Sequence, residues 1–296
     1  MRKLSTRPQE LLTNSGTGQQ SAPLGSRFVT PSGNSVTNFS GRVLSWPNTL
    51  FLVGTHLAAV VGTILYATLH GFSVAAIGIC VAMGIACGLS VTGGYHRLFA
   101  HATYEAHPIV RIFYLIFGAG AWQNSALKWS SDHRRHHAFV DGEDDPYSIR
   151  KGFWWAHIGW IFWQDPPSSP GGKVGDLERD LWVRLQHSLY IPLAVGVGFG
   201  LPLGLGFVFG DPWGGLILGG LLRTVLIHQT TFCVNSLAHT IGSQPYSDLD
   251  SSRDSAITAI VTLGEGYHNF HHTFPFDYRN GVRPFTSIRR SGLFRF

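Results

Sequence analysis

Four long apolar runs, arranged as two close pairs, dominate the pattern of hydrophobic and polar residues along the chain. Short turns at 70–72 and 210–212 separate the members of each pair. Each run is about 20 residues or longer, enough to cross a hydrocarbon core of roughly 30 Å as a helix. We therefore predict an all-α integral membrane protein with four transmembrane helices in two hairpins. The predicted helices cover about 50–69, 73–94, 188–209 and 213–238.

The segments outside the apolar runs are expected to form a polar tail and a cytosolic helical cap. Residues 1–43 are rich in Ser, Thr, Gly, Asn and Gln, which predicts a disordered tail and not a secretory signal. Residues 44–296 would form one membrane domain, whose cap consists of 95–187 and 239–296. Only 13% of the residues are charged and 44% are hydrophobic, which agrees with a membrane protein.

The basic residues predict the orientation of the helices. Ten Lys and Arg fall within 96–187, six follow His239, five lie in the tail and none lies in the two turns. The positive-inside rule then places both termini and the cap in the cytoplasm, at a bacterial inner membrane or the endoplasmic reticulum. The remaining basic residue, Arg223, lies inside the fourth run. Either it is functional, or it forms a buried pair with a polar neighbour such as His228.

Nine of the fifteen histidines stand in four groups, all on the predicted cytoplasmic side. Helix positions i, i+3 and i+4 share one face, so closely spaced histidines can point at one place. Neutral imidazole binds iron, zinc and copper well, and nine rings exceed the roughly four ligands of one zinc ion. We therefore predict a site for two metal ions. Its candidate ligands are His96, His101, His133, His136, His137, His239, His268, His271 and His272.

Asn235 is a tenth candidate, because it lies one helical turn before His239 and so faces the same site. Its amide is a poor ligand beside imidazole but can hydrogen-bond a metal-bound water. Ligating histidines usually donate their second N–H to a fixed acceptor, and Asp132 or Glu265 could serve. Simple salt bridges within the cap are the competing interpretation of these two carboxylates. The three cysteines lie in apolar runs and are interpreted as small buried hydrophobes.

The histidine spacings resemble those of a known family. The motifs His96-x4-His101, His133-x2-His136-His137 and His268-x2-His271-His272 follow one another around the two predicted hairpins, with Asn235-x3-His239 before the last. Together they resemble the integral-membrane fatty acyl desaturases, most closely the Δ9 acyl-CoA (stearoyl-CoA) desaturases and their bacterial relatives. The resemblance covers roughly residues 45–283, and the segment 264–272 is especially similar to the third histidine box of the family.

The resemblance implies a diiron enzyme that introduces a cis double bond, expected at Δ9, into a saturated acyl chain. The nine histidines would hold two Fe ions, Asn235 would hold a water on one of them, and O2 would be the co-substrate. Two electrons would come from a separate donor, such as cytochrome b5 or a ferredoxin with its reductase, since no heme segment is recognisable in the chain. A long-chain acyl-CoA or an acyl lipid would be the substrate, and no nucleic acid is expected to bind.

Several residues are candidates for binding the substrate. Gly84 and Cys80, at least three turns before His96, would lie along the deep end of an acyl groove, where the resemblance places the limit on chain length. Gln123 and Asn124 would lie near the thioester. Arg150 and Lys151 would contact phosphates of the headgroup, or would simply form a solvated charged face.

Three other activities stay open at this point. An acyl-lipid desaturase of other regiochemistry is one, a membrane diiron hydroxylase the second and a metal transporter the third. Transporters bind their substrates near the bilayer midplane, whereas these histidines follow the helix ends. After Arg283 the chain departs from the family pattern, and a truncation or an altered reading frame is one expectation for this segment.

Overall fold

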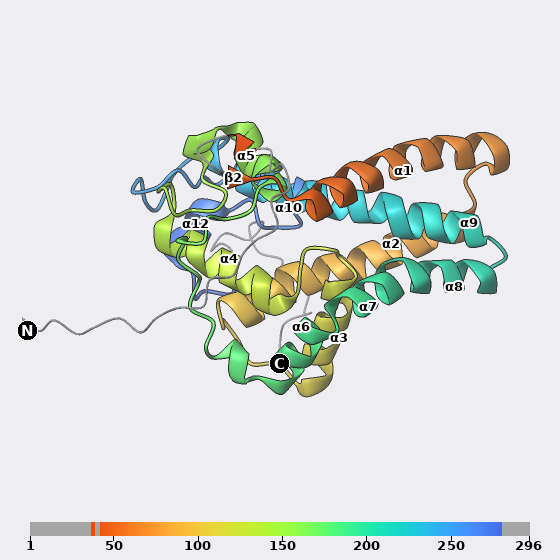
Figure 1. Cartoon of the computed structure of the whole chain (residues 1–296), viewed down its shortest axis with the longest axis horizontal. Coiled ribbons are helices and arrows are strands. Elements are labelled where there is room, and N and C mark those ends of the chain that lie inside the picture. Colours follow the sequence, from red (N-terminus) through yellow and green to blue (C-terminus); the bar gives the residue numbers. More distant parts are fainter. Residues whose placement is uncertain (1–36, 39–41, 280–296) are drawn as a thin grey trace, which may run out of the picture. The chain divides into compact units, whose positions relative to one another are not determined.

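The described part of the chain is almost entirely helical (Figure 1). The computed structural model describes residues 37–38 and 42–279, so most of the predicted polar tail lies outside it. Two short antiparallel strands, β1 (Thr37–Asn38) and β2 (Arg42–Val43), precede the first helix. All described residues belong to the unit Val36–Phe296.

Four helices are long and apolar enough to cross a membrane, which confirms the predicted fold class. The first is α1 (Trp46–His70), and the second is α2 (Val74–Leu89) continued by η1 (Ser90–Ala100). The third consists of α7 (Tyr190–Val195), η5 (Gly196–Gly200) and α8 (Leu201–Val208). The fourth consists of α9 (Pro212–Gly214), η6 (Gly215–Leu222), α10 (Arg223–Ser236) and η7 (Leu237–His239). The second helix continues six residues beyond the predicted end at 94.

A carboxylate joins the two hairpins at the end of the helices remote from the histidines. Asp211 begins the fourth helix by accepting a hydrogen bond from the backbone N–H of Gly214 at 2.8 Å. The same side chain also accepts hydrogen bonds from Tyr66 and Ser73 of the first hairpin. These hydroxyl donors, together with the Gly214 N–H, hold the pKa of Asp211 below its usual value although burial raises it. The far ends of the two hairpins are therefore connected through one ionised group.

The outward faces of the membrane helices are apolar. Large apolar side chains on these faces have more than half of their surface exposed: Leu57, Ile64 and Leu69 on α1, and Val81 and Ile85 on α2. In water such a surface would be unfavourable, whereas hydrocarbon accommodates it. The described protein is thus a multi-pass integral membrane protein.

The cap consists of shorter helices that follow the second and fourth membrane helices. Between the hairpins lie α3 (Pro108–Ala119), α4 (Ala126–Phe139), η2 (Ile149–Lys151), α5 (Phe153–His157), η3 (Gly159–Phe162), η4 (Leu177–Arg179) and α6 (Leu181–Ser188). After the fourth membrane helix come α11 (Ala256–Val261) and α12 (His268–Thr273).

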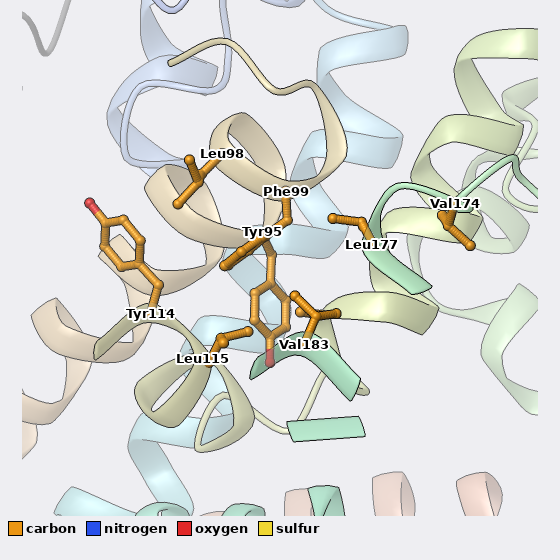
Figure 2. Packing of buried hydrophobic residues seen from close by; sticks show 9 residues of the cluster. Tyr95, Leu98, Phe99, Tyr114, Leu115, Val174, Leu177 and Val183 are labelled. Atoms are coloured by element: carbon orange, nitrogen blue, oxygen red, sulfur yellow. The ribbon is translucent and has the colours of Figure 1, made fainter. Parts of the chain in front are cut away.

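A hydrophobic cluster fixes the cap to the end of the second membrane helix. Tyr95, Leu98 and Phe99 of η1 point into it, against Leu115 of α3 and Val183 of α6 (Figure 2). At its centre Gln186 donates a hydrogen bond to the hydroxyl oxygen of Tyr95 at 2.6 Å. The cluster therefore holds the helix end that carries His96 and His101 in a fixed position relative to the cap.

Arg223 is buried between the membrane helices and the cap, with 1% of its surface exposed. Its guanidinium donates to three backbone carbonyls, those of Gly219 at 3.0 Å, Gly120 at 2.7 Å and Gly198 at 2.7 Å. The alternative of a pair with His228 is therefore wrong: the His228 ring lies 3.1 Å from the carbonyl oxygens of Ala121 and Trp122. Both side chains bind the turn that leads into α4.

Replacing Arg223 with Met should destabilise the protein, because three buried carbonyls lose their donors. Unsatisfied buried polar groups cost about 1–3 kcal/mol each. Arg223→Lys should recover part of the loss, since an ammonium group still donates hydrogen bonds. Thermal unfolding in detergent or nanodiscs measures the effect, with the exposed Arg184→Met as the matched control. An Arg223→Met protein that unfolds at the wild-type temperature would contradict the assignment.

Candidate metal centre

The structure brings the nine clustered histidines together in one buried region. Eight of them form two groups of four in which the possible ligand nitrogens lie within 4.8 Å of one another. The groups are His96, His101, His133 and His271, and His136, His239, His268 and His272. The ninth, His137, lies between the groups: its Nε2 is 3.0 Å from that of His271, and its ring stacks on His272 at a centroid distance of 4.4 Å.

Local helix geometry explains how these residues converge. His133, His136 and His137 share one face of α4, and the third motif repeats the pattern on α12. His96 and His101 are five residues apart, which an α-helix would place on different faces. Here the helix end is π-helical, and the N–H of His101 bonds to the carbonyl oxygen of His96 at 3.0 Å. This i to i+5 pattern brings the two rings to one side.

The ring nitrogens are spaced as the ligands of an ion would be. Nε2···Nε2 distances are 3.0 Å for His96–His271, 2.7 Å for His101–His133 and 3.3 Å for His136–His272. An ion about 2.1 Å from each nitrogen would separate neighbouring ligands by about 3.0 Å at an angle of about 90° and by about 3.4 Å at a tetrahedral angle. Among the described residues, the buried Nε2 of His239 has no hydrogen-bond partner. The donor set therefore fits two metal ions with imidazole ligands.

Burial keeps these rings in the neutral form that binds metal. Desolvation lowers the pKa of His101 to about 2 and that of His268 to about 3. It also holds the pKa values of His133, His271 and His272 well below the usual range, and neighbouring imidazoles add to the effect. A lone pair is thus available on each of these five rings at neutral pH.

Carboxylates orient the rings from outside through the second ring nitrogen. Nδ1 lies 3.1 Å from Glu265 in His96, 2.9 Å from Asp145 in His136 and 3.4 Å from Asp250 in His272. Such partners fix the tautomer and the ring orientation of a ligating histidine. Although burial raises the pKa of Glu265, Arg97 at 2.8 Å and His96 hold it well below its usual value.

Hydroxyl groups play the same part for two other rings. The Nδ1 of His239 lies 2.8 Å from Ser251 Oγ, and that of His133 lies 3.3 Å from the hydroxyl of Tyr147. Ser251 is itself held by Asp141, which accepts hydrogen bonds from its backbone N–H at 2.7 Å and its hydroxyl at 2.6 Å. Every one of these partners comes from a loop of the cap.

Of the two predicted acceptors, the structure places only Glu265 against a histidine. Asp132, which is buried, instead forms an ion pair with the half-exposed Lys128 one turn earlier on α4. Asp145, Tyr147, Asp250 and Ser251 were not singled out as acceptors from the sequence. The only signal for Asp145 was its position in the Asp-Asp-Pro segment that follows the second histidine motif.

A narrow cavity of about 70 Å³ adjoins the first histidine group. His96, His133 and Asn235 line it. The remaining lining includes Gly88 and Val91 of the second membrane helix, Thr230 and Thr231 of the fourth, Trp129 and Leu263. Apolar surface predominates, which suits an alkyl chain. The role of Asn235 in holding a metal-bound water stays a prediction.

Gln123 reaches this cavity through its neighbours. Its amide donates to Thr231 Oγ1 at 2.8 Å, and its carbonyl oxygen accepts from the indole N–H of Trp129 at 3.2 Å. The indole in turn stacks on the His133 ring at a centroid distance of 4.9 Å. Asn124 is exposed, and its backbone N–H donates to the Tyr190 hydroxyl at 3.1 Å. Gln123 therefore supports two residues that line the cavity without lining it itself, whereas Asn124 lies in the turn beside it.

The other predicted substrate residues lie away from the cavity. Lys151 donates to the backbone carbonyls of Glu143 at 2.7 Å and Asp145 at 3.1 Å, so it supports the loop that orients His136. The Arg150 side chain is 70% exposed and 3.9 Å from Asp141. Cys80 and Gly84 do not line the cavity within the described residues. Gly88, one turn closer to His96, does line it.

Comparison with known proteins identifies the family. Residues 72–285 match the fatty acid desaturase family, and the chain belongs to it. A probable acyl-CoA desaturase of Schizosaccharomyces pombe is 48% identical over 198 residues, 66% of this chain and 41% of that protein. A Delta(9)-fatty-acid desaturase of Caenorhabditis elegans is 36% identical over 243 residues, 79% of this chain and 72% of that protein.

The position named for the double bond is not the same in every relative. An acyl-CoA Delta12-desaturase of Acheta domesticus is 35% identical over 250 residues, which cover 79% of this chain and 67% of that protein. The chain spans about two fifths of the length of two fungal relatives, 41% of the Schizosaccharomyces pombe protein and 39% of acyl-CoA desaturase 1 of Saccharomyces cerevisiae. The family is therefore established, and the particular reaction is a matter for proposal.

Asp145→Asn should weaken metal binding, because the amide cannot stabilise the His136 ring as the carboxylate does. Loss of such an outer partner typically costs about 10–100-fold in metal affinity. Competition with a graded series of chelators measures the change in detergent-solubilised protein. Asp176→Asn, which removes an exposed partner of Arg134 away from the histidines, is the matched control. Equal metal retention in both variants would contradict a role for Asp145 in the site.

Proposed function

We propose that the protein is an oxygen-dependent acyl-CoA desaturase that introduces a cis double bond at Δ9 of a long saturated chain. One observation carries the proposal: nine clustered histidines, eight of them in two ligand groups, include His96 and His133, which line a small and mainly apolar cavity among the membrane helices. This arrangement would bring a segment of an alkyl chain next to a metal site. The names of the fungal and nematode relatives support the same reaction.

Two iron ions are proposed for the two histidine groups. His96, His101, His133, His137 and His271 would hold one ion, and His136, His239, His268 and His272 the other, with a water held by Asn235. The irons would supply what no side chain can, the reduction of O2 coupled to removal of hydrogen from an unactivated methylene pair. Overall, O2, two electrons and two protons would be consumed with the two substrate hydrogens, and two waters would form.

The residues around the cavity would select the methylene pair. Trp129, anchored by Gln123 and Thr231, forms a rigid wall next to the first histidine group. A chain pressed against this wall presents one short segment to the ions, which is the positioning that regiochemistry requires. Gly88 leaves room along the second membrane helix, and Gly84 and Cys80 would limit the chain farther along that helix.

The headgroup and the electron donor would approach from the cytoplasmic side. We propose an acyl-CoA whose phosphates contact the exposed Arg150, and a donor such as cytochrome b5 or a ferredoxin with its reductase. The cap, the histidines and both termini would face the cytoplasm, as the distribution of Lys and Arg favours. Because the relative from Acheta domesticus is named a Delta12-desaturase, the position of the double bond in the product must be determined directly.

Expression in a host that lacks its own desaturase tests the reaction. Lipids should gain monounsaturated chains, and mass spectrometry of derivatised fatty acids should place the double bond at Δ9. His271→Ala should abolish the product while the protein still inserts into membranes, because the spanning helices do not depend on the metal ligands. Hydroxylated chains would instead identify a hydroxylase. A double bond at another position would contradict the Δ9 assignment.

We expect two irons per chain in protein purified with its metal retained. Each four-histidine group provides enough neutral nitrogen ligands for one ion. Elemental analysis against protein concentration gives the ratio, and His271→Ala should lower it. A single tightly bound zinc under iron-replete expression would rule out the diiron assignment.

If Gly84 and Cys80 form the closed end of the acyl groove, Gly84→Trp and Cys80→Trp should shift the product toward shorter chains. A filled interior accommodates added volume poorly, so the far end of a long chain would be excluded. Chain lengths of the unsaturated products, measured for each variant against wild type, decide the matter. Gly78→Trp is the control on the same helix, because a side-chain carbon at Gly78 would meet nothing within 4 Å. An unchanged profile at full activity would show that neither residue limits the chain.

A further inference from the structure

The helix α11 and the two residues after it, Thr262 and Leu263, belong to the cap, yet this segment exposes an apolar face. Ile257 is 76% exposed and Ile260 80% exposed, whereas Thr258, Ala259 and Thr262 are buried beneath them. The buried side packs closely on the third histidine motif, since a side-chain carbon at Gly266 would lie 2.1 Å from the Ala259 nitrogen. The outward residues are as apolar as the faces of the membrane helices.

The contacts of Leu263 place the end of this segment at the level of the hydrocarbon core of the bilayer. A methyl group at Gly88 would lie only 3.0 Å from Leu263 Cδ1, so the leucine packs against the second membrane helix. Gly88 follows the start of that span, Val74, by 14 residues, which is about 21 Å along a helix. A hydrocarbon core is about 30 Å thick, so this contact lies within it.

The same leucine is part of the wall of the cavity. It lines the cavity together with Trp129 and His133, and half of its surface is exposed on the outside of the described protein. Its φ of 55° is left-handed, a conformation that a branched side chain adopts only when its surroundings hold it there. Gly264, with φ of 99°, follows it directly. Leu263 therefore lies between the cavity on one side and the protein surface on the other.

We propose that α11 lies in the bilayer and that Leu263 closes a side portal through which an acyl chain passes directly between the cavity and the membrane. The identity of the acyl chain rests on the proposed function, whereas the contact of α11 with lipid does not. A side portal keeps the alkyl chain in apolar surroundings throughout, so the chain never has to be exposed to water. It would serve most of all for release, because the unsaturated product leaves toward lipid.

Fluorescence quenching tests the lipid contact without any need for activity. Cysteines at Ile260 or Leu263, in a full-length chain whose three native cysteines are replaced by alanine, would carry a bimane label in nanodiscs. Lipids brominated along the acyl chain should quench both labels strongly. Ser168, exposed in a polar loop of the cap, is the reference position. Quenching at Ile260 and Leu263 no stronger than at Ser168 would overturn the membrane contact.

Kinetics of stearoyl-CoA desaturation in the same nanodiscs test the portal. Leu263→Trp should lower the ratio of the steady-state rate to the first-turnover rate of reduced enzyme several-fold, because release through the portal is slowed. Leu263→Gly, which also removes the strain of the left-handed backbone, should raise the same ratio. Ile260→Trp, on the same face but outside the cavity lining, should match wild type. Identical ratios in both Leu263 variants and the Ile260 variant would overturn the portal.

The two tests separate failure of the portal from failure of the proposed function. If the wild-type chain forms no double bond, the desaturase proposal fails, and the quenching experiment still decides whether α11 contacts lipid. If the wild-type chain is active and the Leu263 variants behave as Ile260→Trp does, only the portal is wrong.

Discussion

The burial of many neutral imidazoles in one small volume is the constraint on which the rest of the structure depends. Their nitrogens lie about as close as the ligands of a single ion would, and most of the rings are buried away from water. Each ring still carries a second nitrogen that needs a partner. Glu265, Asp145 and Asp250 provide carboxylates for three of them, and each comes from a different loop. The loops of the cap are therefore determined by the second nitrogens of the histidines.

The same constraint requires the cap and the membrane helices to be rigidly joined, because the ligands come from both. The cluster around Tyr95 and Phe99 fixes the end of the second membrane helix to α3 and α6 (Figure 2). Arg223 adds a polar connection by binding carbonyls of the third helix and of the turn before α4. That turn presents Gln123, which anchors Trp129 against His133. A buried charge outside the histidine groups thus supports the wall of the cavity.

The cavity and the membrane surface meet at one segment of the chain. Thr262 and Leu263 line the cavity, Glu265 orients His96, and the third histidine motif follows at once. A displacement of this segment would change the shape of the cavity and the orientation of a ligand together. This proximity is the basis for the proposed portal beside α11.

The sequence by itself determined the four membrane helices, the nine clustered histidines and the family, because hydrophobic length and i, i+3, i+4 spacing are local properties of the chain. Only the tertiary structure decided which histidines form each group, since His96 and His271 meet across 175 positions. It also decided that a π-helical end brings His96 and His101 together, that Asp145 and not Asp132 supports a ligand, and that Arg223 binds carbonyls. These outcomes depend on how distant segments satisfy each other's polar groups once water is excluded, and no local pattern encodes that choice.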